Sequence, residues 1–349
     1  MLFANKPREY VVSFREIIFI LAAFVFILVI LYPKSNLEKQ VLSENTNYNL
    51  SIIYLKNMIR SDPTSEPLML SLAQKSLKAG KLHLALGIVG LLYKSTDAHI
   101  RKEAYLLGYQ LEKATYYFAK DSQGKEEAIQ ALKSNLSVIV QQHYYDTKES
   151  YHWYQEALFL KETQKAYQFI QITLKEHPDN IAYLKDAYYL SEQVGKSTES
   201  IQYLHALQRH DGAHLSQWLE EEYQFLVKIK HIAQAESLLL KLAPGSVYWS
   251  NKLAEFYNAQ NEQIKSAMVY KRLFQTASTY SKKKHYYLLA IKMLRAGNHT
   301  KMASDFAYKY QNRFLKEREM RILLLKLYTA AGDVPKAASL SKKILDKKD

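Results

Sequence analysis

Residues 321–344 read RILLLKLYTAAGDVPKAASLSKKI. Leu324 and Tyr328 are spaced so that they share one face of a predicted helix. Gly332 then supplies a turn, because glycine accepts the left-handed backbone with which many helices end. Ala337 follows as a small residue, and two antiparallel helices approach closely only where one side chain is small. The stretch therefore predicts a hairpin of two helices.

The same pattern recurs through most of the chain. In residues 286–306, Ala290, Gly297 and Phe306 take the equivalent places, with Met302 where the small residue is expected. One hairpin cannot bury both of its apolar faces, so we expect neighbouring hairpins to stack. Successive small-residue positions are separated by 43, 38, 34, 35, 31, 36 and 35 residues. These positions are Ala85, Ala128, Ala166, Ser200, Ala235, Ser266, Met302 and Ala337.

A period near 34 residues built from two helices resembles the tetratricopeptide-repeat (TPR) family. The resemblance covers roughly residues 47–349. It implies an all-α, TPR-like, right-handed superhelical solenoid of about eight repeats. Residues 97–141 depart most from the pattern, because the spacing is stretched there and Asp97–Lys120 reads as one long helix.

The resemblance also implies a concave groove that binds a partner protein. Residues 241–349 carry 22 Lys/Arg and 8 Asp/Glu, which leaves 26 of each sign in residues 1–240. This basic C-terminal third predicts a partner with an acidic surface, although an anionic glycan or lipid headgroups would satisfy the same charge. The residues that the family's register places along the groove are Asn251, Asn258, Lys284, Tyr287, Arg295 and Lys326.

Composition supports a helical chain. The 349 residues include 10 Gly and 7 Pro, which are few for a fold that needs many tight turns. The count of 48% hydrophobic residues is sufficient for a core. The chain has no Cys, which excludes disulfides, iron–sulfur clusters and thiol catalysis.

Residues 17–32 read IIFILAAFVFILVILY and predict a transmembrane signal anchor. A cleaved signal peptide and a buried soluble helix are the alternatives. Cleavage is disfavoured because the residues after the apolar run offer no pair of small side chains. The predicted organisation is a short cytoplasmic N-terminus (1–16), the anchor (17–32), a linker (33–46) and the solenoid (47–349).

The flanking charges predict the orientation of this anchor. Lys6, Arg8 and Arg15 precede the apolar run, whereas Lys34 and Lys39 follow it. The positive-inside rule therefore places the N-terminus in the cytoplasm. The prediction is a single-pass protein of the inner (cytoplasmic) membrane whose repeats lie in the periplasm.

Gly195-Lys196-Ser197-Thr198 matches the end of a nucleotide-binding loop. The loop also needs a glycine five positions before Gly195 and a preceding strand. Leu190 occupies that position, and the residues before it continue a helix. In the phase of the repeat, Gly195 is instead the turn between two helices, equivalent to Gly80, Gly297 and Gly332.

No other motif indicates chemistry. His210, Asp211 and His214 are interpreted as an inter-repeat loop rather than a metal site, because Gly212 interrupts the helix that would align them. Glu220-Glu221-Glu222 is interpreted as a solvated helix start, and Lys282–His285 as a solvated face or an anion-binding patch. We expect no enzyme activity, no cofactor and no metal. Nucleic acid is not an expected partner, because no nucleic-acid-reading motif is present.

The predicted function is a membrane-anchored scaffold or adaptor that holds a partner protein in the cell envelope. Residues 49–63, NLSIIYLKNMIRSDP, resemble the start of PelB-type exopolysaccharide-export scaffolds, which implies a role in exopolysaccharide synthesis or export and in biofilm formation. The further repeats and outer-membrane barrel of that family's long form are not in this sequence. An envelope chaperone or quality-control adaptor for secreted proteins is the alternative function.

Overall fold

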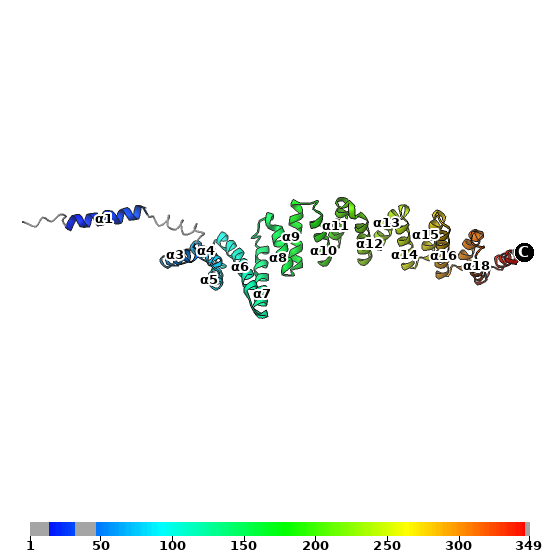
Figure 1. The fold of residues 1–349 in the computed structure, drawn as a ribbon, viewed down its shortest axis with the longest axis horizontal. Helices are drawn as coiled ribbons and strands as arrows, with labels where there is room; N and C mark the ends of the chain where they lie inside the picture. Colours follow the sequence, from blue (N-terminus) through cyan, green and yellow to red (C-terminus); the bar gives the residue numbers. More distant parts are fainter. Residues whose placement is uncertain (1–13, 32–46, 346–349) are drawn as a thin grey trace, which may run out of the picture. The chain divides into compact units, whose positions relative to one another are not determined.

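The computed structural model describes residues 14–31 and 47–345, and every regular element in these ranges is a helix. The all-α prediction is therefore confirmed. The chain forms two compact units, Met1–Lys196 and Ser197–Asp349. Figure 1 shows the helices of each unit in chain order. Most of the predicted N-terminal segment 1–16 and all of the predicted linker 33–46 lie outside the described residues.

The first unit contains α1 (Phe14–Leu31), α3 (Tyr48–Ser61), α4 (Glu66–Lys78), α5 (Leu82–Leu92), α6 (Ala98–Phe118), α7 (Ser122–Gln141), η1 (Thr147–Glu149), α8 (Ser150–Phe159), α9 (Thr163–Glu176) and α10 (Ile181–Gln193). The second unit contains α11 (Ser197–His210), η2 (Gly212–His214), α12 (Leu215–Lys228), α13 (Ile232–Leu242), η3 (Ala243–Gly245), α14 (Val247–Ala259), α15 (Gln263–Thr276), α16 (Tyr280–Ala296), α17 (Thr300–Tyr310), η4 (Gln311–Arg313), α18 (Arg318–Ala330) and α19 (Val334–Leu345).

Helices pack in chain order within each unit. From α3 to α7 and from α8 to α10, each helix contacts the next one, and the same holds from α11 to α19. We call α4, α6, α8, α10, α12, α14, α16 and α18 the first helices, and the helix after each of them the second helix. Helix α3 precedes this series, and Ile52 and Leu55 pack it on Leu68 and Leu72 of α4.

Seven first helices end with the same backbone motif. After α10, the Gly195 N–H donates to the carbonyl of Glu192 (3.1 Å), and the Lys196 N–H donates to that of Ser191 (2.7 Å). These two hydrogen bonds satisfy two carbonyls at the end of the helix. They require the residue that donates the first bond, here Gly195, to adopt the left-handed conformation. The left-handed residues of the seven turns are Gly80, Lys161, Gly195, Lys230, Asn261, Asn298 and Gly332.

The small residue of each second helix lies at a constant distance from this turn. Five positions after the seven left-handed residues stand Ala85, Ala166, Ser200, Ala235, Ser266, Ala303 and Ala337. All of them are buried except Ala337 near the C-terminus, which is half-buried. From Lys161 onward the turns are separated by 34, 35, 31, 37 and 34 residues. The backbone therefore repeats with the period that the sequence predicts.

The hairpin of α16 and α17 corrects the predicted register by one residue. Asn298, with φ of 61°, is the left-handed residue of its turn, whereas Gly297 has φ of −85°. Gly297 is suited to its place for another reason, since a Cβ atom there would lie 2.9 Å from the Cβ of Gln263. The small residue of α17 is consequently the buried Ala303, and Met302 is 43% exposed.

The hairpin of α6 and α7 is the exception to the common turn. Helix α6 has 21 residues and confirms the single long helix expected after Asp97, whose carboxylate caps it by accepting from the N–H groups of His99 and Ile100. Ala119 ends α6 in an extended conformation, and Asp121 caps α7. The two long helices are therefore joined without a left-handed residue, which explains the stretched spacing.

Helix α1 covers nearly all of the apolar run, and its described side chains are mostly exposed, including Phe19 (77%) and Phe26 (66%). Within residues 14–31 and 47–345, no helix has both the length and the apolarity that crossing a membrane requires.

Candidate partner-binding surface

The constant turn makes it possible to compare the four complete first helices of the second unit, α12, α14, α16 and α18, position by position. The residues 12, 8, 5 and 4 places before the left-handed residue are buried in all four helices. Trp218, Trp249, Tyr286 and Met320, for example, share the place 12 residues before it. These spacings follow one face of an α-helix, which is the face that packs in the core.

The residues 13, 10, 6 and 3 places before the turn follow a different face, and none of the sixteen is buried. We call these sixteen residues the exposed stripe. They are Gln217, Glu220, Gln224 and Val227 on α12; Tyr248, Asn251, Glu255 and Asn258 on α14; His285, Leu288, Lys292 and Arg295 on α16; and Glu319, Ile322, Lys326 and Thr329 on α18.

Four of the six residues predicted to contact a partner lie on the exposed stripe. Asn258, Arg295 and Lys326 are exposed, and Asn251 is half-buried. Lys284 lies one position outside the stripe and pairs with Glu317. Whether these side chains bind a partner stays a prediction.

Tyr287 is not available to a partner, so its predicted position in the groove is wrong. Its side chain is completely buried, and its hydroxyl donates to the backbone carbonyl of Ala307 (2.9 Å). The cause is the one-residue slip at Gly297. When positions are counted back from Asn298, His285 takes the stripe place predicted for Lys284. Leu288 likewise takes the place predicted for Tyr287.

The same count finds stripe residues that the sequence reading missed. Lys292 on α16 and Glu255 on α14 both stand six places before the left-handed residue, the place that the predicted Lys326 occupies on α18. These residues could have been found by counting from the buried small residue of the second helix, because its distance from the left-handed residue is constant. The glycine was a misleading marker, because Asn and Lys also occupy the left-handed position in this chain.

Charge is unevenly distributed along the exposed stripe. The α12 and α14 part carries Glu220 and Glu255. The α16 and α18 part carries Lys292, Arg295 and Lys326, together with Glu319. None of these three cations forms an ion pair with any residue that the structure describes. Their charges are therefore available to an anionic group of a partner.

Tyrosine–lysine pairs spaced four residues apart tie neighbouring first helices together. Glu220 of α12 accepts from the Tyr248 hydroxyl (2.8 Å) and the Lys252 ammonium (2.9 Å) of α14. Tyr280 and Lys284 of α16 hold Glu317, at the start of α18, in the same way. In the first unit, Tyr109 and Lys113 of α6 hold Glu156 of α8.

These contacts shift the pKa values of the groups involved. The Lys284 and Tyr280 hydrogen bonds lower the pKa of Glu317, and Glu317 raises the pKa of Tyr280 to about 12. Partial burial of Glu220 opposes its ionisation, but hydrogen bonds from Lys252, Gln224 and Tyr248 outweigh that effect and lower its pKa. Both carboxylates are therefore ionised at neutral pH and act as structural links.

The remaining sequence motifs have structural roles in the helical fold. Gly195 has φ of 75°, which confirms the helix–helix turn and does not fit the strand–loop–helix of a phosphate-binding loop. Asp211 is buried and accepts from the Trp218 indole (3.1 Å), while its other oxygen contacts His214 (2.8 Å). In the described part of the chain, no three His, Asp or Glu side chains are grouped as metal ligands.

The acidic run was misplaced by the sequence reading. Glu220-Glu221-Glu222 lies in the middle of α12, and Glu222 is buried rather than solvated. Its carboxylate contacts His205 (2.8 Å) and accepts from Gln208 (2.6 Å), both on α11. The three glutamates are equivalent in the sequence. Helix packing is what buries Glu222 and leaves Glu220 and Glu221 outside the core.

Comparison with known proteins found no matching family model and no matching curated protein. Among solved structures, the chain is similar to the structure of Naa15/Naa10 bound to HypK-THB, with a TM-score of 0.41 and 13% identity. That match covers 91% of this chain, which spans only 52% of the length of the other. A tetratricopeptide repeat protein from Parabacteroides merdae matches with a TM-score of 0.27, 17% identity and coverage of 76% of this chain and 99% of the other.

The repeated hairpin, its constant turn and its buried small residue define the class of this protein. It is an α-helical repeat protein with TPR-like hairpins. Proteins of this class act through surfaces that successive repeats build together.

Proposed function

We propose that this protein is a membrane-anchored scaffold that binds a partner protein through the exposed stripe. The observation that carries the proposal is the alignment of four successive first helices. In all of them the same four positions lie outside the buried core, although their residues differ. Such a surface suits recognition of an extended or helical segment, whose side chains meet several repeats in turn.

The partner segment is acidic where it meets α16 and α18. Lys292, Arg295 and Lys326 offer three cations without internal partners, and complementary charge raises the association rate and aids specificity. Exposed charges are screened over about 8 Å at physiological ionic strength. Binding should therefore weaken as salt is added.

The experiment is crosslinking of the full-length protein in its native membrane, followed by mass spectrometry. A photoreactive amino acid at Ile322 of the stripe should capture one partner in stoichiometric amount. The variant Lys292→Glu/Arg295→Glu/Lys326→Glu should lose it. The control Lys301→Glu/Lys316→Glu/Lys342→Glu changes the net charge equally at exposed positions off the stripe and should keep it. Equal capture by both variants would contradict the proposal.

The same experiment separates the two classes of function. One stoichiometric partner fits a scaffold for export or for a modifying enzyme, including the PelB-type role in exopolysaccharide export that residues 49–63 suggest. Many weak clients would instead favour an envelope chaperone or quality-control adaptor.

The anchor is the second part of the proposal. The described apolar side chains of α1 are mostly exposed to solvent, and residues 17–32 form one uninterrupted apolar run. We place this run in the inner membrane with the N-terminus in the cytoplasm and the repeats in the periplasm. Alkaline phosphatase fused after Asp349 should then be active. Activity of only a cytoplasmic reporter fused at the same position would refute this orientation.

A further inference from the structure

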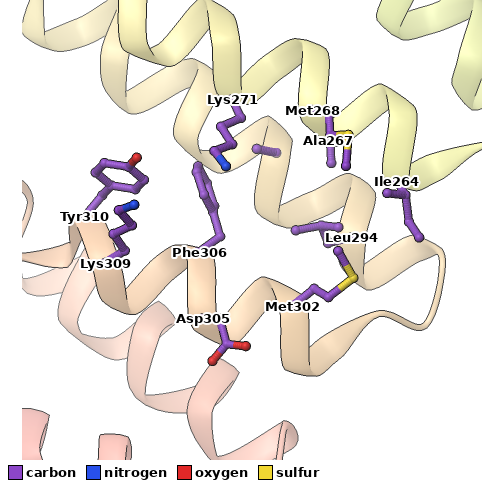
Figure 2. A pocket seen from close by; sticks show the side chains of 11 residues that line it. Ile264, Ala267, Met268, Lys271, Leu294, Met302, Asp305, Phe306, Lys309 and Tyr310 are labelled. Atoms are coloured by element: carbon purple, nitrogen blue, oxygen red, sulfur yellow. The ribbon is translucent and has the colours of Figure 1, made fainter.

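An apolar pocket lies between two second helices, away from the exposed stripe. Helices α15 and α17 form its walls and α16 its floor, and its volume is about 320 Å³ (Figure 2). The space exists because Ala267 and Ala290 put small side chains where the three helices meet. No residue of the pocket belongs to the stripe.

Two exposed methionines flank this pocket. Met268 of α15 is 59% exposed and Met302 of α17 is 43% exposed, whereas the core residues Met293 and Met320 are almost completely buried. Methionine is flexible and polarizable, so it adapts to varied apolar partners. Figure 2 shows both methionines at one end of the pocket, near Leu294.

The other end of the pocket is cationic and aromatic. Lys271 and Lys309 lie there with Phe306 and Tyr310, as Figure 2 shows. Neither lysine pairs with an acid among the described side chains, and Lys309 lies 5.7 Å from the ring centre of Tyr310. Asp305, the acidic residue of the lining, contacts Lys336 at 2.5 Å. The charge that the pocket offers to a ligand is therefore positive.

This polarity defines the ligand. A cavity near 300 Å³ is at the lower limit for small-molecule sites and suits one large side chain. Apolar walls accept Leu, Met or Phe, and the two lysines accept carboxylates close to that side chain. We propose that the pocket is a second docking site, which takes one large apolar side chain of a partner's peptide segment in which acidic residues adjoin that side chain.

The test uses the full-length protein with 13C-labelled methionine methyl groups. The probe is the peptide acetyl-Gly-Asp-Asp-Leu-Asp-Asp-Gly-amide, titrated while the methyl signals are recorded by NMR. The signals of Met268 and Met302 should shift in a saturable way, whereas those of Met58, Met69 and Met320 should not. Replacing the central Leu of the probe by Ser should abolish the shifts, and replacing its four Asp by Lys should weaken them strongly.

Two variants test the protein side. Lys271→Ser/Lys309→Ser should weaken peptide binding roughly tenfold, because it removes two exposed ion pairs, each of which contributes only modestly. Lys316→Ser/Lys342→Ser removes the same charge elsewhere and should bind as the wild type does. Shifts that are equal with the Ser probe, or absent with the Leu probe, would overturn the proposal. So would shifts seen only with phosphatidylglycerol vesicles, which would assign the pocket to a lipid.

Discussion

The hairpin of α14 and α15 and the hairpin of α16 and α17 have the same turn but encode it differently. The first contains no glycine, and Asn261 adopts the left-handed conformation. The second contains Gly297 next to Asn298, and Asn298 is the left-handed residue. The distance from the buried positions, rather than the presence of glycine, therefore decides which residue adopts the left-handed conformation. Asparagine is the non-glycine residue that best tolerates this conformation.

The largest expected effect on stability comes from a substitution that tests which face of α16 is buried. Tyr287→Ala should lower the free energy of unfolding by about 4 kcal/mol, because it removes a completely buried ring. Arg295→Ala, on the exposed stripe, should change it by less than about 0.5 kcal/mol. Urea unfolding followed by circular dichroism measures both. A stable Tyr287→Ala protein with weakened partner binding would restore the predicted groove position of Tyr287.

The next effect tests the small residue of α17. Ala303→Phe should destabilise the protein by about 2 kcal/mol, because Ala303 is completely buried where the helices pack. Met302→Phe should stay within about 0.5 kcal/mol, since Met302 is exposed. Thermal melting compares the two variants. The opposite order would support the register in which Met302 takes the small position.

A turn whose glycine is itself left-handed allows a cleaner test of backbone strain. Gly195→Val should cost about 1–2 kcal/mol. Apart from Gly195 and its two chain neighbours, no residue has an atom within 4 Å of an added Cβ, so the cost comes mainly from the left-handed backbone. Lys196→Ala should leave partner binding unchanged within measurement error. Loss of partner binding in Lys196→Ala would reopen the phosphate-binding interpretation.

The converse substitution should stabilise the hairpin of α16 and α17. Asn298→Gly relieves a left-handed non-glycine residue and should gain about 0.5 kcal/mol, net of the greater freedom of the unfolded chain. Gly297→Ala should destabilise instead, because its Cβ would meet Gln263 and His299 at 2.9 Å. Differential scanning calorimetry resolves both signs. A gain from Gly297→Ala would show that the close approach is not maintained in solution.

The smallest effect concerns the link between α16 and α18. Because Lys284 and Tyr280 lower the pKa of Glu317, its contribution to stability is present above the unfolded pKa of about 4.3 and is lost as pH falls through the lower folded value. Lys284→Met should raise the pKa of Glu317 toward its ordinary range, as a carboxyl 13C NMR titration would measure. An unchanged pKa would mean that the ion pair is not formed in solution.

The fold could be predicted from the sequence more completely than the candidate binding surface could. The helical hairpins, the turn at Gly195 and the long helix after Asp97 were predictable, because each depends on local patterns. The candidate surface was predictable only in part. Asn251, Asn258, Arg295 and Lys326 lie on the exposed stripe, but the slip at Gly297 placed Tyr287 there too.

An all-α repeat of about 34 residues follows from the sequence, since apolar periodicity and turn residues act within one hairpin. The tertiary structure alone decided the register of α16, the burial of Glu222 and the pocket between α15 and α17. The physical reason is that one residue turns a helix by about 100°, so a slip of one position exchanges core and surface. Only packing against neighbouring helices selects between such registers.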